Sequence, residues 1–211
     1  MKHLKTYESF KDNSELIKKL EEFSIKNYTI NDGGIIDVDG DVSLSYRDLT
    51  KIPFKFGNVT GYFDCSFNQL TSLEGCPKEV VGNFNCSNNN LKDLIGGPQE
   101  VGGDYYCHKN LIISLEGSPQ EVGGYFACSD NLLKELIGGP QEVGGGYCCN
   151  DNLLETLEGC SGDIGGYLVC SNNKLEMLDC VSVINNYIIC KGNGFKEEPD
   201  FFGICKFIIW K

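Results

Sequence analysis

The chain has 211 residues, of which 41% are hydrophobic, and it carries a net charge of −12. The apolar fraction is large enough to build a buried core, which excludes global disorder. The acidic balance argues against non-specific binding to nucleic acid or to anionic membranes, since both require a basic surface.

The sequence also carries expectations about location. No apolar run reaches the roughly 18–20 residues that a transmembrane helix needs. The first ten residues lack the apolar centre of a secretory signal. We therefore expect a cytoplasmic protein whose 12 cysteines are free thiols rather than disulfides.

Residues 1–43 differ in composition from the rest and are expected to form an N-terminal segment with a helix and a capping strand or turns. A helix is predicted over residues 14–26, with Asn13 or Ser14 as its N-cap. It would cover one end of the repeat that follows, because solenoids must hide their apolar ends and strand edges. The apolar face of this helix consists of Leu16, Ile17, Leu20 and Phe23.

Asp37, Asp39 and Asp41 come next. Their spacing resembles the start of a calcium-binding loop, but no glutamate closes that loop at the required distance. A turn is therefore favoured over a calcium site.

A repeat of 21 residues occupies the middle of the chain. Cysteine recurs at this step, with a last step of 20, and asparagine stands three residues after each cysteine. A fixed period of this size is typical of a solenoid. The cysteines are Cys65, Cys86, Cys107, Cys128, Cys149, Cys170 and Cys190; the asparagines are Asn68, Asn89, Asn110, Asn131, Asn152, Asn173 and Asn193.

Each column of the repeat has a physical reading. Alternation along a strand turns the cysteine and the apolar residue two positions before it inward, so we expect one strand per coil, paired in parallel with its neighbours. The asparagine side chains would bond the backbone of their own and neighbouring turns. No single coil buries its apolar face, so stability would come from stacking.

These columns resemble the leucine-rich repeat, L-x-L-x-x-N-x-L, with cysteine at the second strand leucine. The resemblance covers Val42 to Phe195, and the chain looks especially like the short-coil repeat proteins encoded by tailed phages. It implies a repeat solenoid over residues 44–195, with a parallel β-strand per coil, an N-terminal helical cap and a C-terminal cap over residues 196–211. A Gly-rich step such as Val101-Gly102-Gly103 departs from the family pattern just before the strand.

A second period of 42 residues is superposed on the first. Leu-Glu-Gly at residues 73–75, 115–117 and 157–159 alternates with Leu-Ile-Gly at residues 94–96 and 136–138. This alternation indicates growth by duplication of coil pairs.

Residues 5–10 are similar to the start of the capsid-targeting peptides on internal head proteins of T4-type phages. Those peptides are removed after a Leu-x-Glu sequence, which Leu20-Glu21-Glu22 matches. The resemblance implies a virion component. The alternative is an N-terminal segment that merely precedes the capping helix.

The repeated cysteines raise the question of zinc. Zinc ligands must converge tetrahedrally, whereas one thiol per coil forms a line, so core packing is favoured and neither metal nor cofactor is expected. Alternation turns Cys148 outward, which makes it the best candidate for a reactive thiol. His108 has no evident acidic partner, so no catalytic residue is assigned.

An acidic column recurs at the same step. We interpret it mainly as a solvated surface, because repulsion between like charges about 5 Å apart is only about 0.8 kcal/mol in water. The alternative is a stripe for a basic partner. The column consists of Glu79, Glu100, Glu121, Glu142 and Asp163.

The outward strand positions are the candidates for a binding surface. Aromatic residues exposed on a rigid sheet are typical of interface hot spots, although cross-strand packing would explain them equally well. Tyr62 and Tyr187 share the column of Tyr125. The candidate protein-binding residues are Asp104, Tyr106, His108, Lys109, Tyr125 and Tyr167.

The favoured hypothesis is a non-enzymatic protein-binding module that uses its sheet face to bind or inhibit a host protein, such as a defence protein. Its phage origin is implied by the resemblance alone. A virion component is the first alternative. An enzyme is the last, because no acid–base pair, nucleophile–base pair or cofactor motif stands out. The identity of the partner and the oligomeric state stay open.

Overall fold

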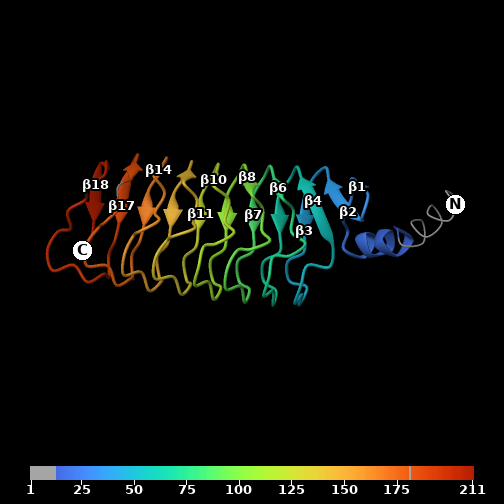
Figure 1. Cartoon of the computed structure of the whole chain (residues 1–211), viewed down its shortest axis with the longest axis horizontal. Helices are drawn as coiled ribbons and strands as arrows, with labels where there is room; N and C mark the ends of the chain where they lie inside the picture. Colours follow the sequence, from blue (N-terminus) through green and yellow to red (C-terminus); the bar gives the residue numbers. More distant parts are fainter. Residues whose placement is uncertain (1–12, 181) are drawn as a thin grey trace.

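The computed structural model describes residues 13–180 and 182–211. The chain winds into a parallel β-solenoid of about eight coils, each of about 21 residues, with a helical segment at the N-terminal end (Figure 1). The sequence-based prediction of a repeat solenoid with a parallel strand in each 21-residue coil and an N-terminal helix is confirmed.

Two sheets of nine strands run along the solenoid. Every neighbouring pair of strands is parallel except β1 and β2, which are antiparallel. The first sheet contains β1 (Tyr28–Ile30), β2 (Ile35–Val38), β4 (Lys55–Val59), β6 (Glu79–Val80), β8 (Glu100–Val101), β10 (Glu121–Val122), β12 (Glu142–Val143), β14 (Asp163–Ile164) and β16 (Val183–Ile184). The second sheet contains β3 (Val42–Ser43), β5 (Phe63–Asp64), β7 (Phe84–Asn85), β9 (Tyr105–Tyr106), β11 (Phe126–Ala127), β13 (Tyr147–Cys148), β15 (Leu168–Val169), β17 (Tyr187–Ile189) and β18 (Phe207–Ile209).

The second strand in each coil is a feature that the sequence analysis did not anticipate. The acidic column lies on these short strands of the first sheet, such as Glu100–Val101. A strand of two residues carries too little alternation to be recognised from a hydrophobic pattern. The column is therefore part of a sheet rather than of a loop.

The core consists of stacked columns between the two sheets. The aromatic rings of the second sheet contact one another from coil to coil, with centroids 5.0 Å apart between Phe84 and Tyr105 and 5.5 Å apart between Tyr105 and Phe126. The seven cysteines of the repeat are buried free thiols in the same core. Each coil thus covers the apolar surface of the next.

The asparagine column joins successive coils. The Asn131 side chain accepts a hydrogen bond from the Ile112 amide at 3.0 Å and donates to the carbonyls of Cys107 and Cys128 at 3.1 and 3.0 Å. Asn110 repeats the arrangement one coil earlier, with Leu91, Cys86 and Cys107. These bonds satisfy backbone groups of buried turns that strand pairing leaves open. The same column continues through Asn68, Asn89, Asn152, Asn173 and Asn193.

The Gly-Gly step forms the corner between the two sheets, where the backbones of adjacent coils lie close together. A Cβ atom on Gly123 would overlap the carbonyl oxygen of Gly102, and one on Gly144 would overlap that of Gly123. In these coils the departure from the leucine-rich pattern thus has a steric cause, because a side chain on these glycines would meet the backbone of the preceding coil.

The 42-residue period reflects two alternating ways to fill the core. The ring hydroxyl of Tyr105 fills the space beside Gly97, where a Cβ would lie 3.2 Å from that oxygen. Tyr147 and Gly139 repeat this pairing two coils later, with 2.9 Å for the corresponding distance. In the alternate coils, cysteine or serine replaces the glycine, and phenylalanine or leucine replaces the tyrosine eight residues later. The pairs are Cys76 with Phe84, Ser118 with Phe126, and Cys160 with Leu168.

The N-terminal end of the solenoid is covered by the helix, which spans residues 13–22 of the described chain. Leu20 is buried against the core, and the ring of Phe23 meets that of Phe54 edge-on at 5.3 Å. Because Leu20 lies buried in this helix, cleavage after Leu20-Glu21-Glu22 would require the helix to open. The similarity to capsid-targeting peptides at residues 5–10 lies outside the described residues.

The three aspartates at residues 37–41 join the first two coils. Asp37 accepts a hydrogen bond from the Asn58 amide at 2.7 Å, Asp39 from the Thr60 hydroxyl at 2.9 Å, and Asp41 from the Tyr62 amide at 3.0 Å. Each carboxylate therefore bonds to the next coil, in an arrangement unlike that of a calcium loop.

Candidate interaction surface

An aromatic ladder runs along the outer surface of the second sheet. The ring of Tyr167 stacks on that of Tyr187 with centroids 5.5 Å apart, and Tyr187 stacks on Phe207 at 5.4 Å. Tyr125 joins the other end, with its centroid 5.9 Å from that of Tyr167. We call Tyr125, Tyr167, Tyr187 and Phe207 the aromatic ladder.

The contact between Tyr125 and Tyr167 depends on Gly146, which occupies the ladder position in the coil between them. Two coils separate the tyrosines, a spacing of about 9.6 Å along a sheet, so rings 5.9 Å apart must lean toward each other. A Cβ on Gly146 would lie 2.7 to 3.0 Å from the Tyr167 ring. The glycine therefore makes the ladder continuous.

An apolar column lies next to the ladder on the same face. Its members are half-buried and pair in register from coil to coil. Ladder and column together form an apolar strip along the C-terminal part of the second sheet. The apolar column consists of Ala127, Cys148, Val169, Ile189 and Ile209.

The predicted residues of the preceding coil are tied into the fold. The Tyr106 hydroxyl donates a hydrogen bond to the Asp104 carboxylate at 2.6 Å, and burial together with this bond raises the pKa of Tyr106 to about 12. Asp104 also accepts a hydrogen bond from the Tyr125 amide at 2.8 Å. Asp104 thus positions its neighbours, and its carboxylate is already occupied on both oxygens.

His108 and Lys109 lie at the polar margin of this surface. Burial, assisted by the charge of Lys109, lowers the pKa of His108, so its imidazole is neutral at pH 7. Its ring meets that of Tyr106 edge-on at 6.2 Å. Lys109 is exposed and has a left-handed backbone with φ of 55°.

The structure therefore groups the predicted residues in two sets. Tyr125 and Tyr167 belong to the ladder, which Tyr187 extends. Asp104, Tyr106 and His108 form a hydrogen-bonded and packed polar set at its N-terminal end. Tyr62 lies apart from the ladder, because Asn83 and Asp104 occupy the column between Tyr62 and Tyr125.

Two components of the strip escaped the sequence analysis. Phe207 continues the ladder because Phe207-Ile208-Ile209 pairs with Tyr187-Ile188-Ile189 at a step of 20 residues. The same step separates Cys170 from Cys190, so the signal was present in the sequence. Gly146 was missed because a glycine in an aromatic column does not show by itself that the tyrosines on either side lean toward each other across it.

Cys148 faces outward as predicted from alternation, but its thiol is less accessible than expected. It is half-buried within the apolar column, and this burial raises its pKa to about 11. The reactive thiolate is therefore a minor species at neutral pH, so this thiol is expected to react slowly.

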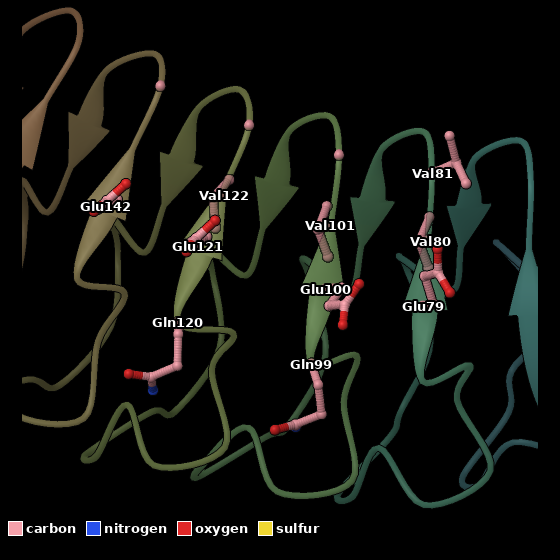
Figure 2. Close-up of a pocket in the computed structure, with 13 residues that line it drawn as sticks. Glu79, Val80, Val81, Gln99, Glu100, Val101, Gln120, Glu121, Val122 and Glu142 are labelled. Atoms are coloured by element: carbon pink, nitrogen blue, oxygen red, sulfur yellow. The ribbon is translucent and has the colours of Figure 1, made fainter.

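The first sheet, on the other side of the solenoid from the aromatic ladder, carries an acidic groove. Figure 2 shows the Glu79, Glu100, Glu121 and Glu142 side chains in a row along it. The groove has a volume of about 730 Å³, and glycines such as Gly102 and Gly123 contribute to its lining. No lysine or arginine is among the described residues that line it. This groove is the second candidate surface, and the charge that recurs along it from coil to coil is negative.

The part of the chain that the structure describes has neither a membrane-spanning helix nor a metal-binding cluster. In residues 13–180 and 182–211, no helix combines the length and apolar character needed to cross a membrane. The same part of the chain contains no group of three or more histidine, cysteine, aspartate or glutamate side chains arranged to hold a metal ion.

Comparison with protein-family models gave no match to this chain, and comparison with curated proteins gave none either.

Proposed function

We propose that this chain is a non-enzymatic binding module that captures a partner protein on the apolar strip of its second sheet. The observation that supports the proposal is the aromatic ladder. Tyr125 and Phe207, at its two ends, are 41% and 52% exposed, although each has an aromatic neighbour. Exposed aromatic side chains held on a rigid scaffold are characteristic of binding hot spots.

The geometry favours a protein over a small ligand. The strip extends over five coils, or about 19 Å at the usual strand spacing, and it is an open surface rather than an enclosed cavity. Its stacked rings present their edges and hydroxyl groups, since neighbouring rings cover their faces. Such a surface suits side chains of another protein better than a stacked sugar or nucleobase.

The resemblance to phage repeat proteins points to a host protein as the partner, with inhibition of that protein as the outcome. A binding role also accords with the state of the titratable groups beside the strip. Tyr106 is bonded to Asp104, and His108 is neutral but contacts an aromatic ring. These groups support packing and positioning.

The test is affinity capture from a host lysate, followed by measurement of binding to the captured protein. We expect Tyr125→Ala combined with Tyr167→Ala to abolish capture while the far-UV spectrum is unchanged. The matched control reverses charge in the acidic groove with Glu100→Lys and Glu121→Lys, which should retain capture. The opposite pattern would transfer the function to the first sheet and its acidic groove.

A further inference from the structure

An exposed pair of aromatic rings lies beside the second sheet, near its N-terminal end. The rings of Tyr46 and Phe67 stack with centroids 4.4 Å apart and an interplanar angle of 10°. Tyr46 is 71% exposed although Phe67 covers one of its faces, so its other face is open. In the aromatic ladder, by contrast, Tyr187 has a ring stacked on each face. The pair of Tyr46 and Phe67, which we call the aromatic pair, therefore offers a flat surface on which a ligand can stack.

Both members of the aromatic pair have a backbone conformation that bulky side chains avoid. Tyr46 and Phe67 have φ of 56° and 52°, in the left-handed region. Except for Lys109, later coils place asparagine, aspartate or glycine at this position, which are the residues that tolerate it best. Because both rings are exposed, core packing does not explain this conformational cost, which points to a role in binding. The later residues are Asn88, Asp130, Asp151, Asn172 and Gly192.

The strands next to the aromatic pair present polar groups and no cation. From β3 to β9, the outward strand residue and the residue two positions before it carry only hydroxyl, amide or carboxylate groups. Arg47 follows Tyr46 in the chain, but its guanidinium lies over the Phe23 ring, 5.0 Å from the ring centroid. Phosphate, sulfate and nucleic acid are therefore disfavoured as ligands. The polar residues are Asp41, Ser43, Tyr62, Asp64, Asn83, Asn85, Asp104 and Tyr106.

Two of these side chains keep unused hydrogen-bonding capacity. One oxygen of Asp64 accepts a hydrogen bond from the Ser66 amide at 2.9 Å, and the Asn85 oxygen accepts one from the Ser87 amide at 3.0 Å. Among the described residues, the other Asp64 oxygen and the Asn85 side-chain nitrogen have no hydrogen-bond partner. Asp64 and Asn85 are in register on neighbouring strands. An acceptor and a donor thus lie side by side, which suits a ligand with several hydroxyl groups, since each hydroxyl both donates and accepts.

We propose that this N-terminal half of the second sheet binds a neutral carbohydrate, with a sugar ring stacked on Tyr46. The C–H groups of a sugar carry a small positive charge and pack against the negative face of an aromatic ring. The sugar hydroxyls would bond Asp64 and Asn85. An apolar protein surface would instead bury these polar groups without partners, at a cost in desolvation.

The spacing of the site indicates the size of the ligand. Asp64 and Phe67 are three residues apart in one coil, a separation of up to about 10 Å along a strand. This distance exceeds one sugar ring, so an oligosaccharide fits the site better than a monosaccharide. The site does not depend on the proposed function, because protein capture uses the C-terminal half of the same sheet.

Ligand-observed NMR titration of the full chain tests the proposal. The panel contains neutral tetrasaccharides of glucose, galactose, mannose and N-acetylglucosamine, a sulfated form of each, and a proline-rich peptide. We expect a neutral tetrasaccharide to bind with a dissociation constant of about 1 mM or below, and its sulfated form to bind more weakly. Tighter binding of a sulfated form, binding of the peptide alone, or no binding by any member of the panel would overturn the proposal.

Tyr46→Asn combined with Phe67→Asn separates binding from folding. Asparagine tolerates the left-handed backbone and occupies this position in the next coil as Asn88, so the midpoint of thermal unfolding should not fall. The affinity for the tetrasaccharide should fall about tenfold or more. If this variant binds the sugar normally, the aromatic pair is not the site.

The matched control removes two rings from the aromatic ladder. Tyr125→Ala combined with Tyr167→Ala should bind the tetrasaccharide as the wild type does, although it is expected to lose capture of the partner protein. Loss of sugar binding in this control would move the carbohydrate site to the ladder. Since each pair of substitutions affects one kind of binding, failure of the carbohydrate site can be told apart from failure of the proposed function.

Discussion

The two sheets of this solenoid share one coil, one register and one spacing, yet their outer surfaces follow opposite rules. Along the first sheet the outward residue is acidic in five successive coils, from Glu79 to Asp163. Along the second sheet the ladder position changes from coil to coil, and reads Tyr62, Asn83, Asp104, Tyr125, Gly146, Tyr167 and Tyr187. The first sheet thus repeats one residue type at its outward position, whereas the second sheet varies it.

That difference separates positions that maintain the coil from positions that distinguish one coil from another. The asparagine column recurs because its side chains make the same bonds between successive coils. A partner that binds a uniform acidic row has several equivalent registers, whereas a varied surface offers one. Specific recognition is therefore expected on the second sheet, and the following predictions test this division.

The largest effect is expected where a charge enters the apolar strip. Val169→Asp would place an unpaired carboxylate at the centre of the proposed interface, at a cost of about 3 kcal/mol or more in binding free energy. Calorimetric titration of the captured partner should show a loss of a hundredfold or more, by the usual conversion of about 1.4 kcal/mol per factor of ten. Ser129→Asp, in the polar column beside the strip, is the control and should bind nearly normally.

A repeated position should affect stability rather than binding. Asn131→Ala leaves the Ile112 amide and three carbonyls without their side-chain partner, so the free energy of unfolding should fall by about 1–3 kcal/mol. Denaturant unfolding measures this loss. Asn150→Ala is the matched control, because the Asn150 side chain is half-buried and, among the described residues, bonds to Asp151 alone. Equal effects at both sites would refute the special role of the asparagine column.

A smaller effect on stability is expected at Gly146, and its sign should depend on whether Tyr167 is present. Gly146→Ala should cost about 1 kcal/mol, because its Cβ overlaps the Tyr167 ring. In a Tyr167→Ala background the same change should be neutral or stabilising, since the methyl group then meets open space and alanine reduces the entropy of the unfolded chain. A double-mutant cycle of unfolding free energies gives the coupling. Independent effects would show that the ring does not lean over the glycine.

The smallest effect belongs to the acidic groove. Glu100→Gln with Glu121→Gln removes repulsion between carboxylates on neighbouring strands, so thermal stability should rise slightly, by less than about 1 kcal/mol. The gain should shrink at high ionic strength, because salt screens these charges. A loss of stability would mean that the glutamates contribute bonds of their own to the first sheet.

Sequence reasoning predicted the coil well and the surface only in part. The cysteine and asparagine columns define the period because the cysteines are buried in all seven coils and the asparagines in the five central ones, so stacking imposes one identity at that position. The surface is less constrained, and its contacts depend on side-chain directions. Asp104 was predicted as a binding residue, but the sequence did not reveal that its two oxygens bond Tyr106 and Tyr125. Cys148 was expected to be accessible, but it is half-buried in the apolar column.

The two alternative residue pairs that fill the core also constrain where recombination between repeats can occur. Tyr105 needs Gly97 eight residues before it, whereas Phe84 follows Cys76 at the same offset. A crossover between coils that falls within those eight residues would combine tyrosine with cysteine, which overfills the core, or phenylalanine with glycine, which leaves a void. A crossover at the asparagine turn keeps each pair together. Crossovers between repeats are therefore tolerated at the asparagine turn and disfavoured within the eight residues that separate the two members of a pair.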